Sequence, residues 1–208
     1  MWYSILIAVL AAYLLGNLNG AVCMSSLLAN DDVRKHGSGN AGLTNFVRNY
    51  GAVKGLAVFA IDAGKTVVAC LVAGLLLKPF ECQLTGMALG GLCVMFGHAF
   101  PALLGFKGGK GILSGLFVAV VVDWRIALII LAVFILVYVI TKYVSLASIL
   151  ASLAFAVCFA VFHYDNLFVM IAGIVMGCLT IFMHRGNIVR LVKGEERKTN
   201  LFGKGKQK

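Results

Sequence analysis

The chain has 208 residues, of which 61% are hydrophobic, 12% are charged and 24 are glycine. An average globular chain has about 25% charged and about 45–50% apolar residues, so a soluble domain could not cover its surface with so few charges. The composition therefore excludes a soluble domain and indicates an integral membrane protein with several spans. The net charge of +10 has an explanation other than nucleic acid binding, since membrane proteins concentrate Lys and Arg on their cytoplasmic side. We expect no nucleic acid partner.

Apolar runs in chain order predict seven transmembrane helices in one polytopic domain over residues 1–208. The first run begins with Met1-Trp2-Tyr3-Ser4. This start lacks the basic region of a signal peptide, so we interpret the run as a transmembrane helix. The fourteen residues from Lys110 to Asp123, around the fourth run, rise only about 21 Å as a helix, short of a roughly 30 Å hydrocarbon core. The alternative is one fused helix over 112–140. The expected spans are 2–28, 52–77, 84–104, 110–122, 126–141, 144–162 and 166–183.

The distribution of basic residues decides between seven spans and six. With seven spans and the N-terminus outside, 15 of the 18 Lys and Arg residues lie inside. With six spans the basic tail over 185–208 would change sides and this asymmetry would be lost. The positive-inside rule therefore predicts an all-α membrane protein with seven transmembrane helices, its N-terminus outside and its C-terminus cytoplasmic.

Cysteine spacing gives no sign of a metal site or a disulfide framework. None of the six cysteines forms a C-x-x-C pair, and no H-E-x-x-H motif occurs. We interpret these cysteines as small apolar side chains. We expect no metal and no cofactor.

The first inside segment, Gly37-Ser-Gly-Asn-Ala-Gly-Leu-Thr-Asn-Phe-Val-Arg48, is rich in glycine and in polar donors. Its G-x-G-x-x-G spacing matches a dinucleotide fingerprint only weakly, because a transmembrane helix precedes it rather than a strand. Glycine lets the backbone approach a ligand closely, and Arg48 could bind an anion in a fork. The alternative is a polar turn between helices. The donor side chains are those of Ser38, Asn40, Thr44 and Asn45.

The second inside segment, Lys107-Gly-Gly-Lys-Gly111, places two ammonium groups and exposed N–H groups just before a helix. Such an arrangement suits a phosphate group. It is not a Walker A loop, because Gly111 follows Lys110 where Ser or Thr is required. Ordinary positive-inside charge is the alternative for the two lysines, but it leaves the glycines unexplained.

Further polar groups gather in two later inside segments and in one span. Lys142 to Ser148 is expected to be a turn and a helix start. His184 and Asn187 are three apart and would share one helical face. Asp62 and Lys65 stand three apart within a span, where an ionisable pair usually faces the bundle interior. They are either a structural ion pair or part of a site. The last stretch, 204–208, is expected to lie near anionic lipid headgroups.

Several catalytic motifs are absent from the sequence. No histidine is followed by an aspartate five residues later, and no G-x-S-x-G nucleophile elbow occurs. The polar groups on the inner side are cations, hydroxyls, amides and backbone N–H groups. This set favours a site that holds anionic oxygens and works by positioning and electrostatics.

These motifs together resemble the bacterial acyl-phosphate:glycerol-3-phosphate acyltransferase family over nearly the whole chain. The resemblance lies in the Gly37–Arg48 segment, in Gly97-His98 with Phe106–Gly111, in Tyr143-x-Ser145, and in His184-x-x-Asn187 with Gly194-x-Glu196-x-Lys198. Leu43, Thr66 and Ser114 depart from the usual pattern of the family. The resemblance implies transfer of a fatty acyl group from acyl phosphate to the 1-hydroxyl of sn-glycerol 3-phosphate, giving lysophosphatidic acid and phosphate. It places the active site at the cytoplasmic face of a bacterial inner membrane.

The resemblance also implies roles for individual residues. Ser38, Arg48, His98 and Lys110 would act in catalysis, and Asn45 and Glu196 would support the structure. The phosphate of the acyl phosphate would be bound by Ser38, Gly39, Asn40, Thr44, Lys107, Gly108, Gly109, Lys110 and Gly111. Glycerol 3-phosphate would contact Arg48, Lys110, Ser145, Ser148, His184 and Asn187, and the choice between the two serines stays open.

The expected mechanism needs no strong base, because an acyl phosphate is an activated mixed anhydride. The hydroxyl proton would pass to a substrate phosphate oxygen or to His98, while Lys110 and backbone N–H groups stabilise the developing charge. The expected partners are the two substrates and the lipid bilayer, and docking of the enzyme that makes acyl phosphate stays open.

Two other classes of protein compete with this interpretation. A small transporter or flippase of a phosphate-bearing lipid would use the same cations. It would also need polar groups near the midplane, and beyond Asn17, Asn19, Asp62 and Lys65 there are few. A non-catalytic scaffold would leave the glycine-rich loops unexplained.

Overall fold

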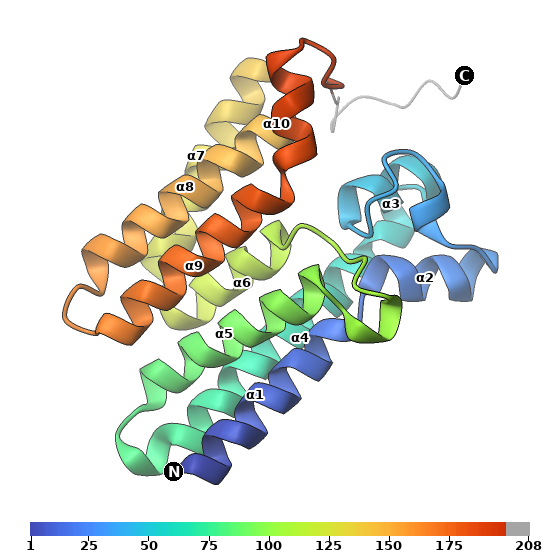
Figure 1. Cartoon of the computed structure of the whole chain (residues 1–208). Coiled ribbons are helices and arrows are strands. Elements are labelled where there is room, and N and C mark those ends of the chain that lie inside the picture. Colours follow the sequence, from blue (N-terminus) through green and yellow to red (C-terminus); the bar gives the residue numbers. More distant parts are fainter. Residues whose placement is uncertain (199–208) are drawn as a thin grey trace.

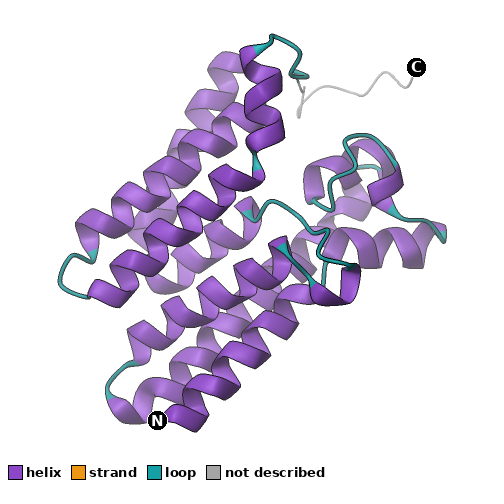
Figure 2. Cartoon of the chain, viewed as in Figure 1, coloured by secondary structure: helices purple, strands orange, loops and turns teal. Residues whose placement is uncertain are grey.

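The computed structural model describes residues 1–198, and every regular element in that range is a helix (Figure 2). Three short 3-10 helices, η1 (Val33–Lys35), η2 (Lys78–Phe80) and η3 (Ala102–Leu104), lie in connections. The α-helices are α1 (Trp2–Asn17), α2 (Gly20–Ala29), α3 (Leu43–Tyr50), α4 (Ala52–Leu77), α5 (Gln83–Ala99), α6 (Ile112–Val122), α7 (Trp124–Thr141), α8 (Val144–Phe162), α9 (Leu167–Met183) and α10 (Arg185–Val192).

The long helices form two groups that meet at α6. Helices α1, α4 and α5 pack against one another, and α7, α8 and α9 form the second group (Figure 1). Helix α6 contacts α4 and α5 on one side and α7 on the other, and α5 also packs on α9. Helices α2 and α3 lie together beside the start of α4, and α10 continues from α9 at an angle of 55°.

Close helix packing in the first group depends on small residues. A Cβ atom on Gly16 of α1 would lie within 3 Å of the backbone of Gly97 in α5, and a Cβ on Gly86 would lie equally close to the backbone of Gly74 in α4. Small residues at such crossings are typical of membrane helices, because van der Waals packing rather than the hydrophobic effect holds helices together in lipid.

The second group shares a larger apolar core with α5 and α6. Met95, Val118, Phe155, Phe159 and Met176 are buried in this core. Because these side chains come from α5, α6, α8 and α9, one continuous core fixes both groups of helices relative to each other.

The helices confirm an all-helical protein with several candidate membrane spans. Within residues 1–198, four helices are long and apolar enough to cross a membrane, and there are up to six candidates if each of two bent helix pairs is one span. Helix α6, an apolar helix of 11 residues, falls below that length. The count of seven spans and the orientation of the chain stay predictions.

The first apolar run, expected to be one helix over 2–28, is divided at Leu18. Leu18 has an extended backbone, Asn19 caps α2 by accepting a hydrogen bond from the N–H of Val22, and the two helices meet at 40°. Asn19 Nδ2 also donates to the carbonyl oxygen of Ala41 at 2.9 Å. The break therefore ties the first run to the Gly37–Gly42 loop.

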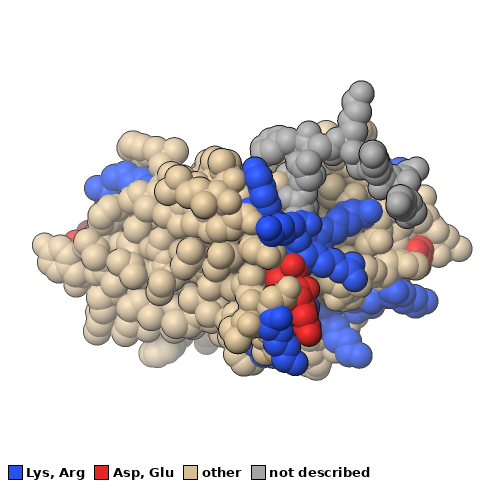
Figure 3. Space-filling model, turned by 90° about the horizontal axis from the view of Figure 1, so that it is seen from above, with Lys and Arg blue, Asp and Glu red and all other residues tan. Residues whose placement is uncertain are grey.

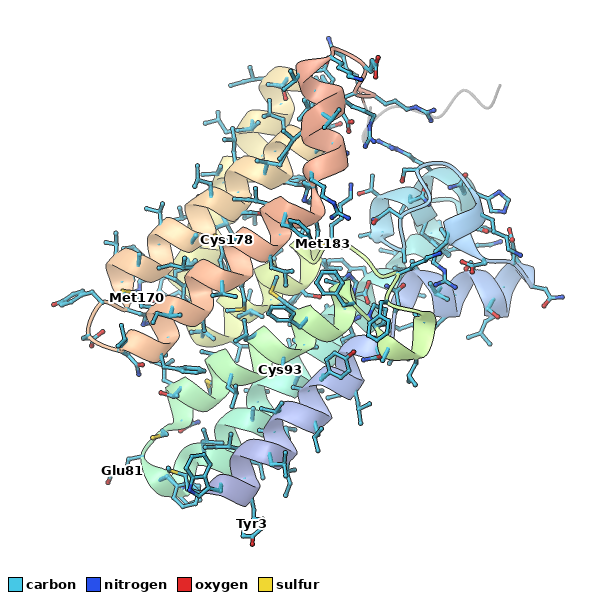
Figure 4. All side chains as sticks on the ribbon, in the orientation of Figure 1. Tyr3, Glu81, Cys93, Met170, Cys178 and Met183 are labelled. Atoms are coloured by element: carbon cyan, nitrogen blue, oxygen red, sulfur yellow. The ribbon has the colours of Figure 1, made fainter. Side chains whose placement is uncertain are left out.

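Basic side chains gather at one end of the bundle. Tyr3 and Glu81 lie at the end opposite α3 and α10 (Figure 4). At the end that carries α3 and α10, Lys and Arg side chains gather around the middle of the molecule (Figure 3). The expected basic tail begins with α10, and its residues 199–208, including the stretch 204–208, lie outside the described residues.

Candidate active site

A cavity of about 1340 Å³ lies between the two groups of helices at the end that carries α3 and α10. Its polar part is lined by five cations, Arg48, Lys54, Lys110, Arg190 and Arg197, against two acids, Asp62 and Glu196. Its apolar part is lined by side chains of α4, α6, α7, α8 and α9, among them Phe59, Leu116, Ile130, Phe134, Phe155 and Met176. One continuous space therefore offers both cationic and hydrocarbon walls.

The Gly37–Gly42 loop is held in place by the side chain of Asn45. The Asn45 amide Nδ2 lies 3.1 Å from the carbonyl oxygens of Val33, His36 and Asn40, and its Oδ1 accepts from the N–H of Ser38 at 3.0 Å. Asn45 is itself buried on the first turn of α3. These bonds fix the positions of Ser38 and Asn40, which line the cavity.

The Phe106–Gly111 loop packs against the C-terminal end of α5. The N–H of Gly109 donates to the carbonyl oxygen of His98 at 3.0 Å, and a Cβ atom on Gly108 or Gly109 would overlap His98. Gly111 has a φ of +83°, a conformation that favours glycine, and it caps α6. Close packing of the loop against α5 thus requires these glycines. In this packed loop, Lys110 lines the cavity.

Lys110 is joined to α10 and to the segment that follows it by a chain of hydrogen bonds. Lys110 Nζ donates to Asn187 Oδ1, and Asn187 Nδ2 donates to Glu196 Oε1 at 2.8 Å. Arg190 Nε donates to Glu196 Oε2 at 2.8 Å. Burial, together with the positive charges of Arg190 and Arg48, outweighs the attraction of Glu196 and lowers the pKa of Lys110 to about 8. A phosphate group would oppose that shift.

Helices α8 and α9 contribute the remaining polar lining. Ser145 and Ser148 are buried near the start of α8, and both line the cavity. His184 follows α9, where its Nδ1 lies 2.8 Å from the carbonyl oxygen of Thr180. A carbonyl can only accept, so Nδ1 carries the proton of the neutral ring and Nε2 is left as the acceptor.

The sequence and the fold match a family of known proteins. The family model described as glycerol-3-phosphate acyltransferase matches residues 6–194. The glycerol-3-phosphate acyltransferase of Thermoanaerobacter sp. (strain X514) is 40% identical over 94% of this chain and 96% of its own, and that of Clostridioides difficile (strain 630) is 39% identical over the same shares. The chain belongs to the glycerol-3-phosphate acyltransferase family.

Two solved structures of an integral membrane member of the glycerol-3-phosphate acyltransferase family, PlsY, share this fold. The glycerol 3-phosphate form has 35% sequence identity and a TM-score of 0.84, over 96% of this chain and 100% of that one. The lysophosphatidic acid form has the same identity and a TM-score of 0.82, over 95% and 96% of the two chains. The resemblance stated from the motifs is thereby confirmed.

Most of the residues that the family motifs single out meet in the cavity. They come from segments as far apart in the chain as α3 and α10. The members lining the cavity are Ser38, Asn40, Thr44, Asn45, Arg48, His98, Lys110, Gly111, Ser145, Ser148, His184, Asn187 and Glu196.

Gly37 and Gly42 of these motifs also line the cavity, whereas Gly39, Lys107, Gly108 and Gly109 lie outside its lining. Gly108 and Gly109 contact His98, and the exposed Lys107 lies outside the lining, its carbonyl oxygen accepting from Arg34. Gly39 lines a smaller neighbouring cavity of about 320 Å³ together with Lys110 and Asn187. Within the described residues, Lys110 and Gly111 are therefore the part of the 107–111 loop that lines the larger cavity.

Sequence reasoning about this family missed several lining residues. Arg190 stands three residues after Asn187, so the same helical spacing that paired His184 with Asn187 could have included it. Ser152 and Thr180 line the cavity from the interiors of α8 and α9, and each hydroxyl donates to the carbonyl four residues earlier. In an apolar run such hydroxyls give no signal that separates a site from a helix interior.

Proposed function

We propose that this protein transfers a fatty acyl group to the 1-hydroxyl of sn-glycerol 3-phosphate and so makes lysophosphatidic acid, the first step of phospholipid biosynthesis. The observation that carries this proposal is the match over nearly the whole chain to PlsY structures in glycerol 3-phosphate and lysophosphatidic acid forms. The cavity supports it, because a cationic part suits the phosphate and an adjoining apolar part suits the acyl chain.

The donor in this proposal is acyl phosphate, with inorganic phosphate as the leaving group. An acyl phosphate carries a phosphate and a hydrocarbon chain on one small molecule, and the cavity offers walls for both within one space. We propose that Ser38, Asn40 and Thr44, with Lys110 and Gly111, bind its phosphate, and that Gly39, Lys107, Gly108 and Gly109 shape the two loops rather than contact it.

Glycerol 3-phosphate is proposed to bind against α3, α8 and α10. Arg48 would hold its phosphate in a fork, and Lys110 would lie between the two substrates. Ser145, Ser148, His184 and Asn187 would contact the glycerol and phosphate oxygens, since all four line the cavity. Asn45 and Glu196 would position these groups through the hydrogen bonds described above.

The proposed reaction proceeds in one transfer. The 1-hydroxyl oxygen attacks the acyl carbonyl carbon and forms the ester bond while the bond from that carbon to the phosphate oxygen breaks. The hydroxyl proton passes to an oxygen of the departing phosphate, so atoms and charge balance. Cations and N–H groups held in place before the reaction would stabilise the negative charge that develops on the carbonyl oxygen.

The proposed arrangement in the membrane has seven spans, with α6 as the fourth, the N-terminus outside, and the cavity at the cytoplasmic face of a bacterial inner membrane. In this arrangement α6 is a short span, and Gly109 and Gly111 of the loop before it are buried in protein rather than exposed to lipid. The cations around the cavity follow the positive-inside rule. Residues 1–198 would form a single domain, and the same face would be available to a soluble enzyme that supplies acyl phosphate.

A comparison of donors tests the proposal. Purified protein would be given radiolabelled glycerol 3-phosphate with palmitoyl phosphate, palmitoyl-CoA or palmitoyl carrier protein, and an Arg48→Ala variant would serve as the control. We expect product with palmitoyl phosphate alone and its loss in the variant. Product with palmitoyl-CoA or the carrier protein would overturn the choice of donor. No product with any donor from folded protein would overturn the enzyme and favour lipid transport, to be measured as flux in liposomes.

A further inference from the structure

A buried polar cluster of Asp62, Lys65 and His98 lies beside the cavity, where α4 and α5 meet the break between α1 and α2. Their exposed fractions are 2%, 5% and 5%. Asp62 and His98 also line the cavity. Ionisable groups this deeply buried in a membrane protein are costly, so their arrangement points to a task beyond packing.

Lys65 has three acceptors within 3 Å, the number that an ammonium group can serve, and a fourth, the carbonyl oxygen of Gly16, at 3.4 Å. Its Nζ lies 2.7 Å from Asp62 Oδ1, 2.7 Å from the carbonyl oxygen of Leu18 and 2.9 Å from His98 Nδ1. Asp62 Oδ1 additionally accepts from the N–H of Gly20 at 3.1 Å, as a carboxylate does. Lys65 Nζ forms an ion pair with Asp62 Oδ1, and an ammonium group can only donate, so the contact with His98 is a donation to Nδ1.

A histidine that accepts at Nδ1 carries its proton on Nε2 when the ring is neutral. The Nε2 edge of His98 lies where the two glycine-rich loops meet, because a Cβ on Gly109 would collide with both Nε2 and the carbonyl oxygen of Ala41. Within residues 1–198, Nε2 takes part in no hydrogen bond. The proton on Nε2 is therefore available to a ligand held by the two loops.

We infer that Asp62 and Lys65 are positioning residues that hold His98 as the Nε2–H tautomer, so that His98 donates a hydrogen bond to an anionic oxygen of the bound acyl phosphate or its transition state. This inference rests on the proposed function. It removes His98 as an acceptor of the hydroxyl proton, because the nitrogen that faces the loops already carries one. The proton is then left to the departing phosphate.

The contrast with His184 supports this assignment. His184 binds the Thr180 carbonyl through Nδ1 and so presents an acceptor at Nε2, whereas His98 accepts through Nδ1 and presents a donor. The two histidines of the cavity thus have opposite tautomers. In each, the hydrogen bond that Nδ1 makes decides whether Nε2 carries a proton. A site that binds anions at one loop and a hydroxyl elsewhere needs both kinds.

Substitutions of His98 distinguish its role as a hydrogen-bond donor from a role as the base that accepts the hydroxyl proton. Gln places an amide N–H close to the position of Nε2, whereas Asn is one carbon shorter and Leu has no donor. Loss of one preorganised donor lowers kcat by about 10² to 10³-fold, which we expect for His98→Leu and His98→Asn. We expect His98→Gln to stay within about tenfold of the wild type, since it keeps the donor. Equal loss of kcat in His98→Gln and His98→Leu, with all variants folded, would overturn the inference.

A direct measurement of the tautomer is independent of activity. The full chain in detergent, labelled with ¹⁵N-histidine, would be compared with His98→Gln to assign the imidazole signals of His98. We expect an unprotonated shift at Nδ1 and a protonated shift at Nε2. A proton on Nδ1 would overturn the inference even if the protein is an active acyltransferase. The expected shifts from a protein with no acyl transfer would instead place the failure in the proposed function.

The pair of positioning residues gives a further test. In Lys65→Met, Asp62 Oδ1, 3.8 Å from His98 Nδ1, would draw the ring proton to Nδ1 and leave Nε2 without a donor. We expect kcat to fall toward the His98→Leu value, and partial recovery in Asp62→Asn/Lys65→Met, where no carboxylate remains. Wild-type kcat in Lys65→Met would overturn the positioning role, and the labelling experiment decides if either variant fails to fold.

Discussion

The two ends of the helix bundle both hold buried polar groups, but they use them differently. At the end opposite α3 and α10, Asp123 accepts from the N–H, Nε and Nη2 of Arg125 at 3.0, 2.9 and 2.6 Å, and His163 Nε2 lies 3.4 Å from Asp123 Oδ2. At the cavity end, five cations face two acids around an open space of about 1340 Å³.

This difference separates structural polar groups from functional ones. Asp123 caps α7, and its charge is balanced by groups that it contacts. Lys110 and Arg48 line a space large enough for two substrates, and their charge exceeds that of the acids beside them. An excess of preorganised donors and positive charge around a void is useful only if an anion enters it. Variants at the two ends should therefore have opposite effects on activity and on stability.

The largest expected effect on activity comes from Lys110→Ala. Lys110 lies between the proposed positions of the two phosphates, and its loss removes a cation that the transition state needs. We expect kcat/KM to fall by about 10³-fold with little change in thermal unfolding. The measurement is the initial rate of lysophosphatidic acid formation. Arg125→Gln at the opposite end is the control, and a comparable loss of activity there would abolish the distinction between the two ends.

A smaller but still large effect is expected from Asn45→Ala, which removes the side chain that holds the Gly37–Gly42 loop. We expect activity to fall by about 10²-fold, in line with the cost of misplacing catalytic groups, and the unfolding temperature to fall as well. Rates and thermal unfolding would be measured together. Asn166→Ala, which removes the cap of α9 outside the cavity lining, serves as the matched control. An active Asn45→Ala with a lowered unfolding temperature would limit Asn45 to stability.

The pKa of Lys110 predicts a pH dependence. The protonated amine binds an anion, and it is present in the free protein below its lowered pKa of about 8. We expect kcat/KM for glycerol 3-phosphate to fall about tenfold for each pH unit above that value. In Lys110→Arg the side chain stays charged, so the descending limb should move out of the accessible range. If kcat/KM of this variant still falls above the same pH, the titrating group is not Lys110.

The smallest expected effect on activity comes from Asp123→Ala at the opposite end. Loss of the helix cap should cost about 1 kcal/mol of stability and leave the rate unchanged. The hydrogen bonds from Arg125 lower the pKa of Asp123. The cap is therefore fully effective above the usual carboxyl pKa and is lost as the pH falls through the lowered value. The difference in unfolding temperature between variant and wild type should accordingly shrink in acid, and a loss of activity would contradict a purely structural role.

Much of the helical framework follows from hydropathy alone. Helix α4, Ala52–Leu77, has the same bounds as the predicted span 52–77. The agreement arises because the few charged residues of this chain lie mostly in the loops that separate apolar runs. The division at Leu18 could not be predicted, since the residues on both sides are apolar and the break depends on a hydrogen bond from Asn19 to Ala41. The short helix α6 lies within the apolar run 110–122, which hydropathy also predicts. Its length alone does not decide whether it spans the membrane.

The candidate site was predictable as a set of segments but not as a set of contacts. The motifs gave the same expected role to Lys107 and Lys110. In the structure, Gly108 and Gly109 pack against His98, so that Lys110 lines the cavity and Lys107 is exposed. The choice between Ser145 and Ser148 likewise has no local signal, and both line the cavity. The role of Asp62 and Lys65 could not be read from their spacing.

The sequence by itself determined that this is a helical membrane protein, where most of its long helices lie, and which segments bring cations and glycines to the cavity. Hydropathy and charge are properties of each residue and its near neighbours, so the linear sequence is enough to predict apolar helices and charged segments. The tertiary structure decided which donors share a cavity and which nitrogen of His98 carries a proton. The bond from Lys65 to His98 joins residues 33 positions apart. Such contacts depend on how distant helices cross, which no local pattern in the sequence records.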